Sequence, residues 1–293
     1  MKHILCLALL PCLACGEHKT SAFKDETAPG TIRLTGSTTM FAGTSAAAAA
    51  FMAIRPDVKV SVSQSSSGAG IHSLIIGEAD IANSSRPPSP REFEEARAAS
   101  VILKSYQVGY DALALIVHPE TGRHVPKVDR AQLRKIFFDG TITDWSELSP
   151  KLSGPIHVYV RDQATSGSAD AFTRYITGRT GTPFVAGARM LESTTLLCPS
   201  IADDKLGIAF APFGFADIHI AAKVDVATVA YSDGRSPALT PSRETIRSLS
   251  YPLRRDLYMI TNNTPSGHLN DFIQFILHPD GQKVLQAAGI VGL

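Results

Sequence analysis

The stretch Thr31-Ile32-Arg33-Leu34-Thr35-Gly36-Ser37-Thr38-Thr39 decides the fold, because it joins an alternating segment to a turn of small residues. Apolar and polar residues alternate over positions 31–35, which is typical of a half-buried strand. The turn leads into an apolar segment that we expect to be helical over residues 41–54. A second alternating segment, Val58-Lys59-Val60-Ser61-Val62, follows it. Strand, turn, helix and strand in this order predict a parallel β–α–β unit.

The same pattern is repeated directly afterwards. Residues 65–70 form a second turn of small residues, a helix is predicted at residues 71–77, and Asp80-Ile81-Ala82-Asn83 is predicted to be a short buried strand. Further strands are predicted at residues 110–117, 156–160, 207–210 and 257–260, and further helices at residues 130–138, 169–176, 268–277 and 279–288. Residues 232–242 are rich in Pro, Ser and Gly and are predicted to form a surface loop. This alternation of elements predicts an α/β fold.

The composition excludes several classes of protein. The chain has 293 residues, of which 44% are hydrophobic and 19% charged, as in ordinary globular proteins. Lys and Arg number 28 against 27 Asp and Glu, giving a net charge of +1. Since there is no basic excess, we expect no nucleic-acid partner. The length is sufficient for two domains.

The N-terminus has the pattern of an export signal. A positive start at Met1-Lys2-His3 precedes an apolar run over residues 4–10, which is too short to span a bilayer. The following Cys12-Leu13-Ala14-Cys15-Gly16 resembles a bacterial lipobox, with Cys12 where the pattern prefers Leu. We expect a signal peptide at residues 1–14, lipidation of Cys15 and a polar tether at residues 15–27. The alternative is a plain signal peptide with incidental cysteines.

Cysteine usage predicts a mature chain without disulfides. The four cysteines are Cys6, Cys12, Cys15 and Cys198. Cleavage before Cys15 removes two of them and lipidation uses a third, so Cys198 has no partner. We expect Cys198 to be a small buried apolar residue.

Three turns of small residues, at residues 36–39, 65–70 and 165–168, lie between a predicted strand and a predicted helix, and residues 83–87 follow another strand. In open parallel sheets such turns lie at the carboxyl ends of the strands, where ligands bind. Helix N-termini offer free N–H groups and partial positive charge, and Ser and Thr hydroxyls add donors. Together these groups predict oxyanion binding. The alternative is that the hydroxyls only cap the helices.

Arg161 lies at the predicted end of a strand, directly before the turn at residues 165–168. A guanidinium there would grip an oxyanion through two parallel hydrogen bonds. The alternative is a surface ion pair, for example with Asp162.

No enzyme motif stands beside these turns. Ser166 lies in Thr-Ser-Gly-Ser, which is not a Gly-x-Ser-x-Gly nucleophile elbow. The sequence has no His-Glu-x-x-His, no Cys-x-x-Cys after Cys15 and no complete Walker loop. We therefore expect a protein that is not an enzyme and has no metal or other cofactor.

Several segments together resemble the phosphate-binding proteins of phosphate ABC importers, over residues 31–293. The segments are Leu34-Thr35-Gly36-Ser37-Thr38-Thr39, Ser67-Gly68-Ala69-Gly70-Ile71, residues 77–86, residues 133–145, Arg161 with Ser166-Gly167-Ser168, residues 251–258 and Pro279-Asp280-Gly281-Gln282-Lys283.

The resemblance implies a type II periplasmic-binding-protein fold, in which two α/β lobes are joined by a hinge of two crossing strands. We place the first crossing near Tyr110 and the return near Ser250. Lobe one is then residues 28–110 plus 251–293, and lobe two is residues 111–250. Closure of the lobes around the ligand is the expected motion.

The resemblance also implies a set of phosphate-binding residues. They are Ser37, Thr38, Thr39, Ser67, Ser85, Arg161, Ser166, Gly167 and Ser168. Some members carry an Asp in place of Ser85, and there it accepts the ligand's proton. The spacing from Arg161 to Ser166 is one residue longer than is usual. Either another carboxylate, with Asp162 nearest in sequence, replaces that Asp, or selectivity against sulfate is relaxed; we expect phosphate to remain preferred.

The function implied by the resemblance is high-affinity binding of inorganic phosphate in the cleft between the lobes and its delivery to an ABC importer. The expected partner is the permease of that importer, and the expected location is the periplasm or cell envelope. The only expected membrane contact is the lipid anchor, and a monomer is expected. The alternative is an oxyanion sensor or scavenger that is not coupled to a transporter.

Overall fold

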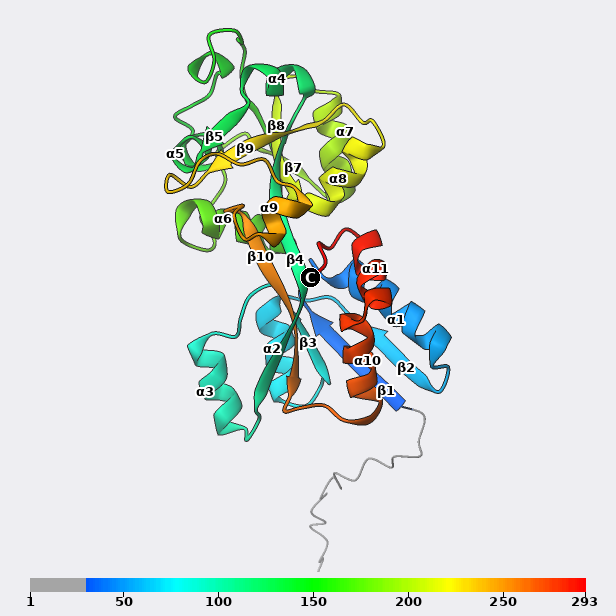
Figure 1. Cartoon of the computed structure of the whole chain (residues 1–293). Coiled ribbons are helices and arrows are strands. Elements are labelled where there is room, and N and C mark those ends of the chain that lie inside the picture. The colour runs from blue at the N-terminus through cyan, green and yellow to red at the C-terminus, as the bar shows by residue number, and fades with distance from the viewer. Residues whose placement is uncertain (1–29) are drawn as a thin grey trace, which may run out of the picture.

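The computed structural model describes residues 30–293, which form two lobes stacked along the long axis of the molecule (Figure 1). The predicted signal peptide, the tether and Cys15 lie outside the described residues.

The strands are β1 (Gly30–Gly36), β2 (Val58–Val62), β3 (Ile81–Ser84), β4 (Leu103–Val117), β5 (Lys127–Asp129), β6 (His157–Arg161), β7 (Arg189–Leu191), β8 (Gly207–Pro212), β9 (Ala227–Ser232) and β10 (Arg254–Asn262). The α-helices are α1 (Phe41–Ile54), α2 (Ser67–Ile75), α3 (Pro90–Ala98), α4 (Pro119–His124), α5 (Arg130–Arg134), α6 (Gly167–Thr177), α7 (Leu197–Ala202), α8 (Phe213–Ala221), α9 (Arg243–Arg247), α10 (Gly267–Leu277) and α11 (Pro279–Ala287).

Lobe one contains the β–α–β units predicted from the opening stretch. β1 pairs in parallel with β2 and with β3, so the predicted parallel arrangement is confirmed. Ile32 and Leu34 point into the core and Arg33 between them is exposed, as the alternation requires. Helices α1, α2, α10 and α11 cover the sheet (Figure 1). The carboxyl ends of β1 and β3 therefore meet at the edge of the lobe that faces lobe two.

Two long strands connect the lobes. β4 pairs antiparallel with β10 over residues 103–112 and then with β8 over residues 113–117. The strand order β2-β1-β3-β10-β4-β8-β6-β7 is thus one continuous sheet through both lobes. This is the predicted two-lobed fold with a hinge of crossing strands, and it is confirmed. β4 runs through both lobes without a break, so the strand itself does not mark where one lobe ends and the other begins. The predicted lobe bounds stay a prediction.

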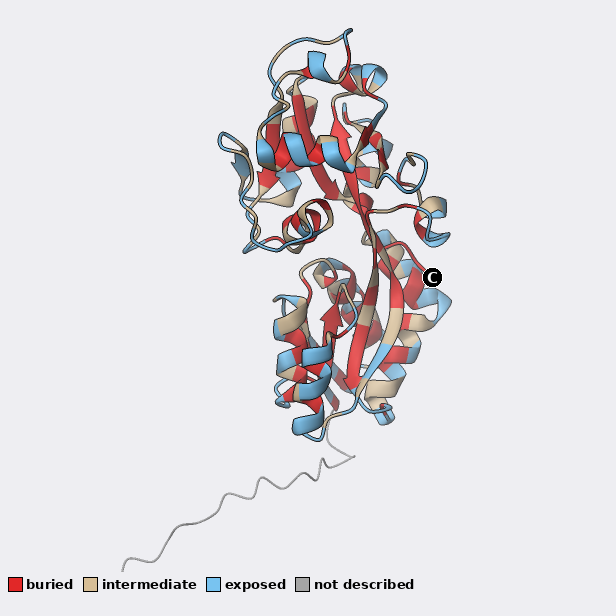
Figure 2. Cartoon of the chain, turned by 90° about the vertical axis from the view of Figure 1, so that its left-hand side faces the viewer, coloured by how far each residue is buried: buried red, intermediate tan, exposed pale blue. Residues whose placement is uncertain are grey.

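Lobe two is built on β6 and β8, which pair in parallel, with β7 at the edge. Its core holds the side chains of Phe137, Phe172 and Phe210, with the rings of Phe172 and Phe210 stacked 3.9 Å apart. Buried residues concentrate on the central strands of both lobes, and the outer helix faces are exposed (Figure 2). Cys198 is fully buried, as expected, and burial raises the pKa of its thiol to about 12.

The C-terminal segment after α11 also connects the lobes. Tyr110 of β4 and Val291 exchange both backbone hydrogen bonds, at 2.7 and 2.9 Å. The Val291 side chain packs in the core of lobe two, although the helix before it belongs to lobe one. The backbones of Gly289 and Gly214 touch so closely that a Cβ on Gly214 would lie 1.9 Å from the Gly289 carbonyl oxygen.

Helix α3 was not predicted, although its first residues carry a pattern typical of a helix start. α3 begins with a capping box, in which Ser89 accepts from the Glu92 backbone and Glu92 accepts from the Ser89 backbone. The Ser89-Pro90-Arg91-Glu92 pattern announces such a helix start. The predicted helix at residues 130–138 exists, but its second half, Lys135–Asp139, is a π-helix turn.

Candidate functional site

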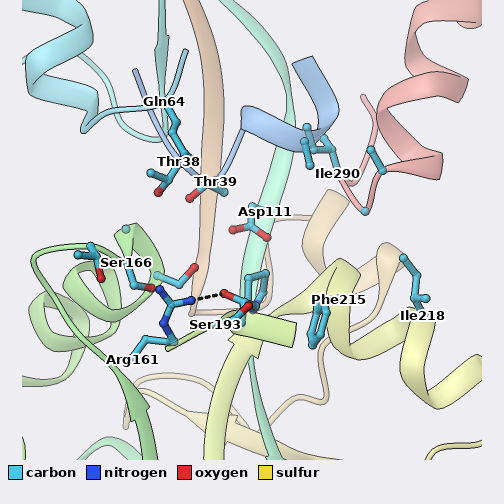
Figure 3. Close-up of a pocket in the computed structure, with 18 of the residues that line it drawn as sticks. Thr38, Thr39, Gln64, Asp111, Arg161, Ser166, Ser193, Phe215, Ile218 and Ile290 are labelled. Atoms are coloured by element: carbon cyan, nitrogen blue, oxygen red, sulfur yellow. Dashed lines mark hydrogen bonds between the residues drawn. The ribbon is translucent and has the colours of Figure 1, made fainter. Parts of the chain in front are cut away.

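Two adjoining cavities of about 480 and 530 Å³ lie in the cleft between the lobes. They share the lining residues Thr38, Gln64, Thr165 and Gly167. The first cavity extends toward α8 and the C-terminal segment, and the second toward α2 and α6. Figure 3 shows the first, with Thr38, Thr39 and Gln64 above and Arg161 and Ser166 below.

The turn after β1 brings the hydroxyls of Thr38 and Thr39 to the cleft. Gly36 has φ +131° and lies against the Asn83 backbone, which lets the Ser37 N–H bond the Asn83 carbonyl at 2.9 Å. Helix α1 begins without a side-chain cap. Thr38 and Thr39 therefore do not serve as caps, and their hydroxyls line the first cavity.

The second turn is tied to the strand end beside it. Ser66 caps α2 by accepting from the Ala69 N–H at 3.1 Å. Ser67, the next residue, accepts from the Ser85 N–H at 3.1 Å, and the two hydroxyls lie 3.3 Å apart. Ser67 and Ser85 thus sit side by side on the wall of the second cavity.

Lobe two contributes Arg161 and the turn that follows it. Ser166 caps α6 by accepting from the Ala169 N–H at 3.3 Å, so its hydrogen is not used by the cap. Gly167 touches the opposite lobe, because a Cβ there would lie 3.0 Å from the Thr38 hydroxyl oxygen. The turns at residues 36–39 and 165–168, called the anion turns of lobe one and lobe two from here on, are therefore in contact at this point.

Arg161 differs from the other arginines of the cleft. Its Nη1 donates to the Thr194 hydroxyl at 3.2 Å, drawn as the dashed line in Figure 3. Its Nε is buried and, among residues 30–293, has no hydrogen-bond partner. Within the same part of the chain no carboxylate lies within salt-bridge distance of it. A buried donor without a partner costs free energy unless a ligand accepts from it.

The arginines of the second cavity are already paired. Arg86 makes two 2.8 Å hydrogen bonds to the Glu92 carboxylate, and Arg174 lies 3.5 Å from Asp170. Burial acts to raise the pKa of Glu92, but the hydrogen bonds from Arg86 and from the Ser89 backbone outweigh it and lower the pKa. Glu92 therefore remains an anion that compensates Arg86, which leaves Arg161 as the uncompensated cation of the described cleft.

A buried ion pair closes the hinge side of the first cavity. Asp111 of β4 and Arg255 of β10 are direct cross-strand partners, and they are 4% and 5% exposed. Arg255 donates to one carboxylate oxygen, Oδ2, from Nε at 2.9 Å and from Nη2 at 2.7 Å. The other oxygen, Oδ1, has no hydrogen-bond partner within residues 30–293, and Asp111 lines the first cavity (Figure 3).

The comparison with protein families identifies the architecture. A family model described as the PBP superfamily domain matches residues 21–280. The chain belongs to the PBP superfamily.

Individual known proteins also resemble the chain over most of its length. Protein SphX of Synechocystis sp. is 27% identical over 281 residues, covering 93% of this chain and 79% of SphX. The phosphate-binding protein PstS of Staphylococcus aureus is 25% identical over 238 residues, covering 80% of this chain and 70% of PstS. A solved structure of "a possible phosphate binding protein" from Planctomyces limnophilus has a TM-score of 0.75 and 26% identity, over 91% of this chain and 94% of that one. The predicted resemblance to phosphate-binding proteins is confirmed.

The fold of an ABC-type phosphate transport receptor from Vibrio cholerae is also similar, with a TM-score of 0.72 over 88% of this chain and 98% of that one. Its sequence is 23% identical to this chain.

All nine residues predicted to bind the ligand line one or both cavities of this PBP-superfamily cleft. The first cavity is lined by Thr38, Thr39, Arg161, Ser166, Gly167 and Ser168, and the second by Ser37, Thr38, Ser67, Ser85 and Gly167. Their contact with a ligand stays a prediction. The hydroxyls of Ser66 and Ser166 do cap helices, so that alternative holds in part, but those of Thr38 and Thr39 do not.

The carboxylate suggested by sequence proximity, Asp162, lies elsewhere. It is exposed, accepts from the Ala164 N–H at 2.8 Å and shapes the loop before α6. The structure brings Asp111 to the cavity instead, and sequence reasoning missed it. Arg255 was part of a family marker, at residues 251–258, but had no role assigned. The only local signal for Asp111 is a single charge at the head of an apolar strand.

Among residues 30–293, no three His, Cys, Asp or Glu side chains are grouped closely enough to ligate a metal ion. No helix in this part of the chain has the length and hydropathy needed to cross a bilayer.

Proposed function

We propose that this protein binds inorganic phosphate between its lobes and delivers it to an ABC importer, without catalysing a reaction. The observation that carries the proposal is the buried Nε of Arg161, which lacks a partner among the described residues and lies where hydroxyl-bearing turns of both lobes meet. A tetrahedral oxyanion offers four acceptor oxygens to such convergent donors. The similarity to PstS and to the Planctomyces limnophilus protein supports phosphate as that anion.

Asp111 is proposed to select the ligand. Its free oxygen is a hydrogen-bond acceptor in a cavity whose other polar groups are mostly donors. Hydrogen phosphate has a P–O–H group that donates a hydrogen bond to this carboxylate, whereas fully ionised sulfate has no such donor and is repelled. Asp111 would thus take the role of the Asp that some members of the family carry in place of Ser85.

The direct test is calorimetry of the purified protein with phosphate, arsenate, sulfate and molybdate. We expect saturable one-to-one binding of phosphate, with sulfate unable to displace it at equal concentration. Displacement by sulfate would identify a general oxyanion receptor instead. Co-purification with a permease distinguishes a transport receptor from a sensor or scavenger.

Replacing Asp111 with Asn should shift selectivity toward sulfate. The substitution removes the repelling charge and leaves Arg255 uncompensated, so we expect the ratio of phosphate to sulfate affinity to fall by about tenfold, corresponding to ~1.4 kcal/mol. The measurement is competition of sulfate against labelled phosphate. Glu192→Gln is the matched control, because Glu192 lines the same cavity but is exposed. An unchanged ratio in folded Asp111→Asn protein would assign selectivity to another group.

We also propose that the protein is exported and held at the membrane by a lipid on Cys15. The support is the sequence pattern at residues 1–16. Cys15→Ala should abolish acylation, because the thiol is the atom that carries the diacylglyceryl group. Mass spectrometry of the mature N-terminus checks this. A mature chain that begins elsewhere without acyl mass would contradict the anchor and leave the phosphate site unaffected.

A further inference from the structure

Arg255 makes contacts that an ion pair with Asp111 does not require. Besides the two hydrogen bonds to Asp111, its Nη2 donates to the Thr39 hydroxyl at 2.8 Å. The Ser168 hydroxyl lies 3.2 Å from the same Nη2 and, because this nitrogen has two hydrogens, shares one of them with a shorter bond. Its Nη1 donates to the Gly167 carbonyl at 3.1 Å. One buried guanidinium on the hinge thus contacts the anion turn of lobe one and the anion turn of lobe two.

These contacts determine which way two hydroxyl hydrogens point. A guanidinium carries five N–H donors and no acceptor. Because Arg255 donates to the oxygens of Thr39 and Ser168, the hydrogens of these hydroxyls must point away from it. Across residues 30–293 neither hydroxyl donates to any acceptor of the protein, and both line the first cavity. Their hydrogens are therefore available to an anion in the cleft.

We infer that Arg255 is a positioning residue of the oxyanion site: it sets the hydroxyls of Thr39 and Ser168 as donors toward the ligand and joins the two anion turns before the ligand arrives. This inference rests on the proposed oxyanion-binding function and deepens it. A purely structural Arg255, needed only to neutralise Asp111, would leave the direction of the hydroxyls to the ligand and would be replaceable by any cation.

The test compares Arg255→Lys with wild type. Lysine keeps the charge opposite Asp111, but as a point charge on a flexible stem it does not reproduce the planar fork that reaches both turns. We expect the melting temperature to stay near that of wild type while phosphate affinity falls by about tenfold or more, since a well-placed donor to an ionised acceptor contributes that much. Phosphate affinity equal to that of wild type would overturn the inference.

A coupling experiment separates positioning from general damage to the site. Thr39→Val removes a hydroxyl that Arg255 orients, and Thr38→Val removes a neighbouring cavity hydroxyl that Arg255 does not contact. We expect Thr39→Val to weaken binding by about tenfold in wild type and by less than about threefold with Lys at 255, because coupled residues are not additive. Thr38→Val should have the same effect in both backgrounds. A Thr39→Val effect that is independent of residue 255 would also overturn the inference.

The cycle is run with whichever of phosphate, arsenate, sulfate or molybdate binds wild type most tightly. If that anion is sulfate or molybdate, the phosphate proposal fails while the coupling still decides the role of Arg255. If none of the four binds, both proposals are wrong.

Discussion

Replacing Arg161 with Met is expected to weaken phosphate binding by about thirtyfold or more, because truncating one partner of a buried charge pair costs ~2 kcal/mol at least. The buried Nε of Arg161 has no partner in the part of the chain that the structure describes, so the ligand is the acceptor that completes it. The folded protein without ligand should retain its stability, since no ion pair within residues 30–293 is lost. Calorimetry gives the affinity, and a thermal melt of the same sample checks the fold.

Arg174→Met is the matched control. Arg174 also lines the cleft, but it is 42% exposed and already lies near Asp170, so its loss should change affinity less than about threefold. Equal affinities for wild type and Arg161→Met would contradict the proposed role of Arg161. A larger loss of affinity in Arg174→Met than in Arg161→Met would also contradict it and would place the anion in the second cavity.

Gly36→Ala is expected to lower the free energy of unfolding by about 3 kcal/mol or more. At φ +131°, an added Cβ would lie 2.1 Å from the Asn83 carbonyl oxygen. That carbonyl accepts from the Ser37 N–H, so it does not move away without breaking the link between β1 and β3. Urea unfolding measures the change.

Gly77→Ala separates the clash from the conformational penalty. Gly77 also has a positive φ, +78°, but nothing lies within 4 Å of an added Cβ. Only the penalty for a left-handed conformation remains, about 1 kcal/mol. If both variants unfold at the same urea concentration, the close approach of Gly36 to Asn83 contributes nothing.

The local parts of the fold were predictable from sequence. The alternating strands, the turns after them and the helices that follow are encoded within ten or fifteen neighbouring residues, so the predicted parallel β1–α1–β2 unit agrees with the structure. The small residues of the turns predicted oxyanion binding at the strand ends, and the family resemblance named Thr38, Thr39 and Ser67 among the residues of the cleft, whose cavities they line.

The ion pair between Asp111 and Arg255 at the hinge was not predictable in the same way. Asp111 and Arg255 are 144 positions apart and meet only because β4 and β10 pair in one particular register. A shift of one residue would turn either side chain to the other face of the sheet. Proximity to Arg161 in the sequence therefore suggested Asp162 as the carboxylate of the site, whereas its side chain accepts from the Ala164 N–H within the loop.

The place of β10 in the sheet has a consequence for the order in which the lobes are completed. β10 lies between β3 and β4, yet its residues follow every strand of lobe two along the chain. When synthesis has reached residue 250, lobe two has all of its strands, whereas lobe one lacks a central one. The edges of β3 and β4 that face each other lack the strand that lies between them in the folded chain until residues 254–262 are made. The lobe whose first strands are made earliest is thus the last to close its sheet, and the Arg255 that joins the two anion turns arrives with the same strand.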